Sequence, residues 1–148
     1  MDGSDQEIAT DGVVTLKLPR PGDAQLLIAG RDDEFFRWLG PGAEEPRPVA
    51  CIWVGDKLVG WVDYDLDHDW LQPGQVNVGY CLFPDARRKG YASRAVKLLL
   101  LHLKRDTEYT VATLVIHREN VRSLGLARRL GFVPAGEVKG DLFFTRDV

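Results

Sequence analysis

The sequence predicts a mixed α/β fold in which hairpin strands come first and alternating strands and helices follow. In the first half, two β-branched and aromatic runs joined by a short turn indicate antiparallel strands. In the second half, short apolar runs alternate with segments whose apolar residues recur at helical spacing. A chain of 148 residues, 45% hydrophobic and 28% charged, fits a single domain.

The first elements are a strand and a helical region. Residues 13–18 read as a strand, and a helical pattern starts at Asp23 after a Pro-Gly turn. Residues 30–33 contain glycine and two aspartates, which predicts a break into two helices. Residues 40–48 are too rich in glycine and proline for regular structure, so we expect a loop there.

Three strands are expected next. Residues 49–54 and 58–66 are rich in β-branched and aromatic side chains, and residues 55–57 between them predict a hairpin connection. Residues 76–83 supply another strand, which Pro84 ends.

From residue 90 onward the pattern alternates between helix and strand. The expected elements, in order, are a helix over 90–104, a strand over 111–116, a helix over 120–130, a strand over 132–138 and a strand over 141–145 that follows a turn at 139–140. Hairpins followed by crossover helices imply a mixed sheet with helices on its faces.

Composition excludes several classes of protein. A net charge of −3 implies no general affinity for nucleic acid or anionic membranes. The leucine run 98–101 is far too short to span a bilayer, and the acidic N-terminus does not resemble a secretory signal, so we expect a cytoplasmic protein. Cys51 and Cys81 lack the spacing of redox or zinc sites, which predicts reduced, buried thiols and no metal.

The most informative segment is Arg87-Arg88-Lys89-Gly90-Tyr91-Ala92, which lies between the strand over 76–83 and the helix that follows. Free backbone N–H groups at such a helix start can hold a diphosphate, assisted by the helix dipole and the basic side chains. Glycine lets a ligand approach the backbone closely. The alternative is a surface turn with ordinary solvated basic residues.

This pattern resembles a known signature. Arg87-x-x-Gly90-x-Ala92 is similar to the acyl-CoA pyrophosphate motif of the GNAT superfamily of N-acetyltransferases, in particular the branch that includes ribosomal-protein N-terminal acetyltransferases. The matching segments around it are Val78-Gly79-Tyr80, Asn120-x-x-Ser123 and Leu130-Gly131-Phe132. The resemblance extends from about Val76 to Val138, with weaker agreement from Val13 onward, and implies a GNAT-like acyl-CoA N-acyltransferase fold for the whole chain.

The resemblance also implies a co-substrate and the residues that hold it. Acetyl-CoA would be bound through its pantetheine arm and diphosphate by Cys81, Leu82, Phe83, Arg87, Arg88, Lys89, Gly90, Tyr91, Ala92, Ser93 and Asn120. Asn120 is equally natural as a helix N-cap, and the two roles are compatible. Arg118 or Arg122 either reaches the 3′-phosphate of CoA or is a plain solvated arginine.

The catalytic groups depart from the family pattern. Many relatives carry a glutamate where this chain has Asn77, and an amide cannot accept the proton of the amine. Asp63 and Asp65 are the replacement candidates, although they also fit a solvated acidic edge. His68 is a further candidate base.

The usual tyrosine acid is also replaced. Ala127 occupies the position seven residues after Asn120 where many relatives carry it, and the resemblance implies that Ser123 donates to the departing thiolate instead. A CoA thiol resembles free cysteine, with a pKa of about 8.5, so its protonation is not compulsory.

The resulting hypothesis is an N-acetyltransferase that moves an acetyl group directly from acetyl-CoA to a primary amine within a ternary complex. The acceptor is expected to be a peptide N-terminus or a small molecule, with no nucleic-acid or membrane partner, and a homodimer is left open. The main alternative is an acyl-CoA sensor without turnover. A weaker one is a nucleic-acid-binding module that uses the arginines of the second half.

Overall fold

The structure, a computed structural model, describes residues 6–148. Its strands form a sheet in the order β1-β2-β3-β4-β5-β6-β8-β7. Strands β5 and β6 pair in parallel, and the pairs β1–β2, β2–β3, β3–β4, β6–β8 and β7–β8 are antiparallel. The predicted mixed sheet is therefore confirmed. The chain divides into two compact units: unit 1 holds residues up to 63 and 80–99, and unit 2 holds residues 64–79 and 100–148.

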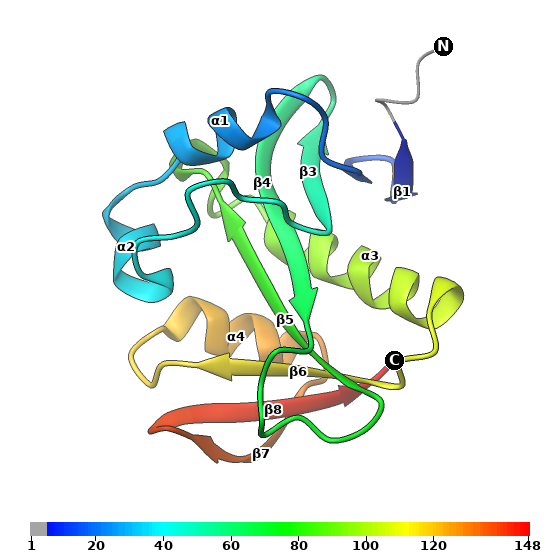
Figure 1. The fold of residues 1–148 in the computed structure, drawn as a ribbon, viewed down its shortest axis with the longest axis vertical. Helices are drawn as coiled ribbons and strands as arrows, with labels where there is room; N and C mark the ends of the chain where they lie inside the picture. Colours follow the sequence, from blue (N-terminus) through cyan, green and yellow to red (C-terminus); the bar gives the residue numbers. More distant parts are fainter. Residues whose placement is uncertain (1–5) are drawn as a thin grey trace. The chain divides into compact units, whose positions relative to one another are not determined.

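Unit 1 is built on two hairpins, β1 with β2 and β3 with β4. The bounds of its strands are β1 Glu7–Thr10, β2 Val14–Lys17, β3 Ala50–Val54 and β4 Lys57–Asp65, the last of which continues into unit 2. Leu16 faces Ile52 across the β2–β3 pair, and both side chains are fully buried. The predicted turn between β3 and β4 is present at Gly55 and Asp56 (Figure 1).

Strand β1 was missed by the sequence reading. Its four residues carry only two apolar side chains, Ile8 and Ala9, so no clear alternation marks it. It pairs antiparallel with β2 through a turn at Asp11 and Gly12, where Gly12 has a φ of 90°. The partner strand, rather than the local sequence, therefore defines β1.

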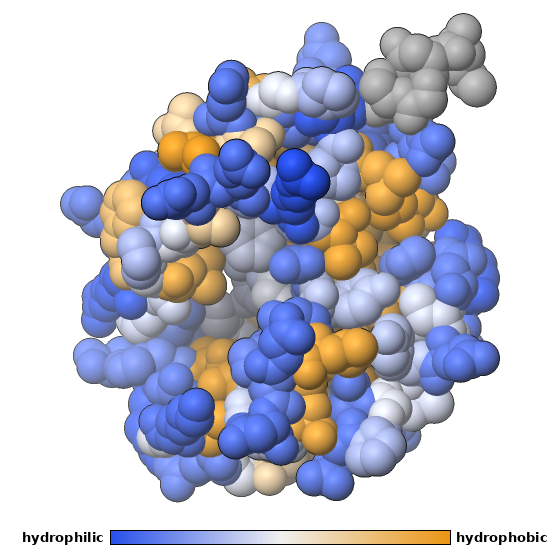
Figure 2. Space-filling view, viewed as in Figure 1, coloured by the Kyte–Doolittle hydropathy of each residue, from blue (hydrophilic) through white to orange (hydrophobic). Residues whose placement is uncertain are grey.

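The predicted break between two helices is confirmed in unit 1. Helix α1 spans Asp23–Ala29 and α2 spans Asp33–Leu39, with Gly30 ending the first and Asp32 capping the second. Their main apolar contributions to the core are Leu27 and Phe35. Other apolar side chains of these helices remain exposed, as the orange patches over α1 and α2 in Figure 2 show; they are Leu26, Ile28, Phe36 and Leu39.

Unit 2 contains the strand and helix alternation predicted for the second half. Its elements are β6 Val111–Ile116, α4 Val121–Arg129, β7 Val133–Val138 and β8 Asp141–Asp147, together with the first part of β5 Gln75–Leu82. Strand β8 turns back after Lys139 and Gly140, as expected, and lies between β6 and β7. Figure 1 shows β6, β8 and β7 as neighbouring strands, with α4 running along β6.

Helix α3, Tyr91–Asp106, follows β5 and the short 3-10 helix η2, Pro84–Ala86. Its first nine residues belong to unit 1 and the remainder to unit 2. Ala95, Val96, Leu99 and Leu103 are fully buried at helical spacing, which confirms the predicted apolar face. Within the described chain, no helix combines the length and the apolar character needed to cross a membrane.

Strands β4 and β5 approach each other unusually closely at Gly60. A Cβ atom at this position would lie 2.1 Å from the carbonyl oxygen of Cys81, which is backbone and cannot rotate away. Glycine is therefore required by the close approach of two backbones. This contact fixes the end of β5, from which the segment before α3 departs.

We predict that Gly60→Ala lowers the free energy of unfolding by about 1–3 kcal/mol, because the strands must separate to admit the methyl group. Urea unfolding measures the effect. Gly125→Ala in α4 is the matched control, since its Cβ would meet only the flexible end of Arg129, and alanine favours helix by about 0.5–1 kcal/mol. Equal stability of Gly60→Ala and the wild type would contradict the close approach.

Candidate functional site

The predicted anion-binding segment does connect a strand to a helix in unit 1. Strand β5 ends at Leu82, and α3 begins at Tyr91. Between them the backbone enters the left-handed region twice, at Arg88 with a φ of 65° and at Gly90 with a φ of 82°. Glycine tolerates this conformation, but for an arginine it costs about 1–2 kcal/mol. Strain of this kind persists where the surroundings hold it, and it concentrates at functional sites.

Gly90 is open to its surroundings. A Cβ at this position would meet nothing within 4 Å. The glycine is therefore explained by its backbone angle and by access to the backbone, rather than by packing. Such access is what a ligand bound by peptide N–H groups requires.

Arg87, at the start of this segment, is held by two carboxylates of α2. Its Nη1 donates to Asp32 Oδ2 over 2.7 Å and its Nη2 to Asp32 Oδ1 over 2.8 Å. Nη1 also lies 3.3 Å from Glu34 Oε2. The hydrogen bonds from Arg87 lower the pKa of Asp32 to about 2, against a partial opposing effect of burial. The side chain of Arg87 is thus fixed by a bidentate ion pair with Asp32.

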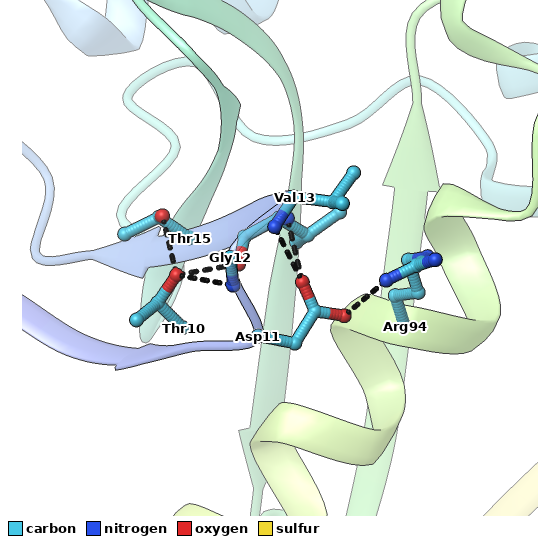
Figure 3. A network of polar contacts seen from close by, with 7 residues as sticks. Thr10, Asp11, Gly12, Val13, Thr15 and Arg94 are labelled. Atoms are coloured by element: carbon cyan, nitrogen blue, oxygen red, sulfur yellow. Dashed lines mark hydrogen bonds and ion pairs between the residues drawn. The ribbon is translucent and has the colours of Figure 1, made fainter.

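Arg94, on the first turns of α3, is held in a similar way by the turn between β1 and β2. Its Nη1 donates to Asp11 Oδ2 over 2.9 Å, as Figure 3 shows. Asp11 Oδ1 accepts from the backbone N–H groups of Val13 and Val14 over 2.9 and 2.8 Å. Burial raises the pKa of Asp11, but these hydrogen bonds and Arg94 together lower it. The same carboxylate therefore orders a turn and anchors α3.

The two basic residues between these anchors differ from them. Arg88 and Lys89 are exposed, and neither forms an ion pair with any residue from 6 to 148. Their charges lie at a helix start, where the first N–H groups of a helix lack partners within the helix itself. The residues present therefore fit a diphosphate.

The strand that leads into the segment supplies Cys81, Leu82 and Phe83. Phe83 N–H donates to the carbonyl of Val59 over 2.8 Å, so this donor is used by β4. Burial raises the pKa of the Cys81 thiol to about 11 and that of Cys51 to about 12. Both cysteines are therefore thiols at neutral pH, and neither is an activated nucleophile.

A pocket of about 140 Å³ lies beside the segment in unit 1. Its lining combines the β3–β4 hairpin with the residues before α3 and consists of Val54, Lys57, Leu58, Val59, Phe83, Asp85, Ala86, Lys89 and Tyr91. The lining is largely apolar, with Lys57, Asp85 and Lys89 as its charged members. Residues 83–91 therefore border an apolar pocket in addition to carrying the basic side chains of Arg88 and Lys89.

In unit 2, Asn120 and Ser123 lie together at the start of α4. Asn120 is the N-cap of the helix, and its Oδ1 accepts from the Ser123 backbone N–H over 3.4 Å. The N-cap interpretation is thus confirmed, and it leaves the Asn120 amide group able to donate. Ser123 is half-buried. Arg118, a candidate for the CoA 3′-phosphate, is paired with Glu137.

The two candidate bases are used differently. Asp63, in unit 1, accepts the backbone N–H of Val49 over 3.0 Å and so fixes the start of the β3–β4 hairpin. Asp65, in unit 2, has its Oδ1 2.8 Å from Nε2 of His68. This oxygen forms no aligned hydrogen bond, so the contact is one of proximity and charge.

His68 is stacked on Trp70, with ring centroids 4.7 Å apart, and Trp70 makes an edge contact with Phe143 at 5.4 Å. Of the two aspartates, Asp65 is the one whose partner can itself carry a proton. The aromatic contacts hold the His68 ring in place beside it.

Asn77 and Ala127 occupy the positions where many relatives carry acid–base groups, and both serve the fold of unit 2. Asn77 Oδ1 accepts from the Thr113 hydroxyl over 3.1 Å, across the parallel β5–β6 pair. Ala127 is fully buried, and its carbonyl accepts from Phe132 N–H over 2.9 Å. Neither residue can transfer a proton.

Two residues at the site were missed by the sequence reading, Asp32 and Asp11. Asp32 stands directly before a helical pattern, which is a recognisable N-cap signal, but its pairing with Arg87 joins residues 55 positions apart. Asp11 has no comparable sequence signal. In the part of the chain that the structure describes, no group of three or more His, Cys, Asp or Glu side chains is placed to hold a metal ion.

Comparison with known proteins adds a family and a set of similar folds. A family profile described as "Acetyltransferase (GNAT) domain" matches residues 19–133. No curated protein matches the sequence significantly.

Among solved structures, the RimL ribosomal L7/L12 alpha-N-protein acetyltransferase in its apo form has a TM-score of 0.80 at 15% identity, covering 100% of this chain and 98% of that one. An acetyltransferase of the GNAT family from Bacillus anthracis has a TM-score of 0.79 at 14% identity, covering 96% and 98%. The microcin C7 self-immunity acetyltransferase MccE, in complex with acetyl-CoA and AMP, has a TM-score of 0.75 at 18% identity, covering 99% and 98%. At these identities the likeness concerns the fold.

The ion pair of Asp32 predicts a pH-dependent stability. The carboxyl has a folded pKa of about 2 and an ordinary value of 3.8, so between these values the unfolded chain binds the proton more readily. Its stabilisation is complete above the ordinary value and is lost as the pH falls through the folded one. Asp32→Asn should therefore lower the free energy of unfolding by about 1–2 kcal/mol at pH 6 and by progressively less towards pH 2.

Urea unfolding across this pH range measures the difference. Asp33→Asn is the matched control, because Asp33 is exposed and forms no ion pair within residues 6–148. A difference between Asp32→Asn and the wild type that stays constant with pH would contradict the assignment.

Proposed function

Because the chain belongs to the GNAT acetyltransferase family, we propose that it transfers the acetyl group of acetyl-CoA to a primary amine, with the whole chain acting as one catalytic domain. The acceptor is a peptide N-terminus or a small molecule. The acetyl group passes directly within a ternary complex, without an acetylated protein intermediate.

The observation that carries this proposal is the geometry of residues 88–93. A left-handed turn at Arg88 and Gly90 leads into α3, and two basic side chains without ion-pair partners in the described chain lie on it. Together these features suit the diphosphate of CoA, because peptide N–H groups, a helix dipole and positive side chains all favour an anion. Asn120, through its amide N–H₂, is the proposed donor to the pantetheine arm.

The thioester of bound acetyl-CoA supplies an activated acetyl group. Direct transfer is favoured by the state of the cysteines, since burial raises the pKa of both thiols to about 11 or 12 and leaves no thiolate nucleophile. The chain must then provide a neutral amine and stabilise the departing sulfur.

The required base depends on the amine. An α-amino group with a pKa of about 8 costs only about 1.4 kcal/mol to deprotonate at pH 7, whereas a lysine costs about 4.6 kcal/mol. A weak base therefore suffices for a peptide N-terminus. Asp65 with His68 is the stronger candidate, because Asp63 is committed to the backbone of Val49. The acidic run 63–69 also attracts a cationic acceptor.

Ser123 is the proposed donor to the departing thiolate. Its place at the start of α4 is set by the Asn120 cap, and the positive end of the helix dipole favours a developing negative charge there. The thiol of CoA has a pKa of about 8.5, so the departing thiolate needs only a weak donor. A serine hydroxyl is therefore adequate in place of the tyrosine.

The second candidate function is an acyl-CoA sensor without turnover. It is favoured by one observation: Asn77 is tied to Thr113 and Ala127 is buried, so neither position where relatives hold acid–base groups can serve here. Cofactor binding is common to both functions, and turnover separates them.

Titration calorimetry with acetyl-CoA, followed by thiol release on a panel of peptide and small-molecule amines, tests the proposal. We expect binding, and turnover with at least one amine of low pKa. Arg88→Glu should weaken binding at least about tenfold, because it places a negative charge beside the diphosphate.

Arg128→Glu is the matched control for Arg88→Glu, since it makes the same charge change at an exposed position of α4. An unchanged Kd for Arg88→Glu would remove residues 88–93 from the cofactor site. Binding without turnover on any amine would favour the sensor.

Ser123→Ala tests the donor to the thiolate. We expect kcat to fall about 10- to 100-fold while the Kd for acetyl-CoA changes less than about threefold, because the hydroxyl acts when the sulfur departs. Ser123→Thr keeps a hydroxyl and should retain more of the rate. If Ser123→Ala turns over as fast as the wild type, Ser123 has no part in the chemistry.

A further inference from the structure

The guanidinium of Arg87 is occupied before any ligand arrives. Both of its terminal nitrogens donate to the two oxygens of Asp32, and Glu34 lies 3.3 Å from Nη1. Its side chain is only 17% exposed. With two carboxylates around one guanidinium, the local charge is not positive, and an anionic ligand gains little from it. Arg87 thus differs from the exposed Arg88 that follows it.

Asp32 joins this arginine to α2. It is the N-cap of the helix, and the same Oδ1 that accepts from Arg87 also accepts from the Phe35 backbone N–H over 3.1 Å. One carboxylate therefore fixes the start of α2 and the residue before the 88–93 segment. The charged carboxylate therefore joins these two parts of the chain.

A second contact strengthens the junction. The ring of Phe83 packs against Gly30 so closely that a Cβ there would lie 2.4 Å from two of its carbons. Residues 83–87 therefore meet the α1–α2 connection at two points, one apolar and one ionic. Both contacts lie within unit 1.

We propose that Arg87 is a positioning residue. Its bidentate ion pair with Asp32 holds the strained turn at Arg88 in the shape that presents the backbone N–H groups of residues 88–93. The same ion pair links ligand binding at these residues to the start of α2. The strain lies in the residue directly after the anchor, where a left-handed arginine requires support from its surroundings. The inference rests on the proposed function in taking acetyl-CoA as the ligand.

The competing role for Arg87 is that of a direct phosphate ligand, and the two roles predict opposite signs for one substitution. Asp32→Asn keeps an oxygen for the helix cap but removes the charge that holds Arg87. If Arg87 positions the segment, its release weakens binding of CoA. If Arg87 is itself a phosphate ligand, its release strengthens binding.

The experiment is a double-substitution cycle measured by calorimetry with CoA. We expect Asp32→Asn and Arg87→Gln each to raise the Kd about tenfold, and the double variant to be within about twofold of the single variants, because both remove one shared interaction. Arg87→Lys should not restore affinity, since lysine lacks the planar fork that matches a carboxylate. A direct phosphate ligand would be largely replaced by lysine.

Asp33→Asn is the matched control, because it removes the same charge from the neighbouring residue, which is exposed and forms no ion pair within residues 6–148. Its Kd should change less than about threefold. Once an amine that the protein acetylates is known, KM and kcat of the variants distinguish a loss of positioning from poor folding. Loss of positioning raises KM for acetyl-CoA, whereas a smaller folded fraction lowers kcat at constant KM.

The outcomes are distinct. Weaker binding by Asp32→Asn, no rescue by lysine and a non-additive cycle support the positioning role. Tighter binding by Asp32→Asn, rescue by Arg87→Lys or a fully additive cycle overturns it while leaving the proposed function intact. A wild-type protein that binds neither CoA nor acetyl-CoA overturns the proposed function and this inference together.

Discussion

The turn that enters helix α3 depends on a balance between backbone strain and two ion pairs. Arg88 adopts a left-handed conformation that is unfavourable for it, and the arginines on either side are fixed by carboxylates from α2 and from the β1–β2 turn. Because Arg87 and Arg94 are anchored, the residues between them can keep a shape that local preferences oppose. The same anchoring separates Arg87 and Arg94, which are held in ion pairs, from Arg88, whose charge we propose faces the ligand.

Within residues 6–148, the proposed catalytic groups, unlike the anchored segment before α3, form no ion pairs between charged side chains of opposite sign other than the contact of Asp65 with His68. These groups are weak ones: a serine at the start of α4 and an aspartate in contact with a histidine. Such groups are sufficient when the amine is easily deprotonated and the leaving group is a thiol. The proposed chemistry therefore depends more on holding the reactants than on strong acids or bases, which is consistent with the structural roles of Asn77 and Ala127.

Local sequence patterns were enough to predict most of the fold. Alternating strands, the β3–β4 turn, the helix break before Asp32 and the apolar face of α3 each follow from spacing within a short window. Strand β1 was missed because its partner, not its own four residues, defines it. The basic segment was found from its residue types, but the partners of Arg87 and Arg94 were not, since each pair joins residues far apart in the chain. Sequence spacing carries no information on such pairs.

Backbone amide NMR, comparing CoA with pantetheine, tests the central claim most directly. Pantetheine lacks the diphosphate and the adenosine 3′-phosphate, so the two ligands separate contacts of the phosphorylated half of CoA from contacts of the arm. We predict that CoA shifts the amide resonances of residues 88–93 strongly and that pantetheine does not. If CoA leaves these resonances unchanged while it perturbs others, the phosphates are held elsewhere and the account of this segment is wrong.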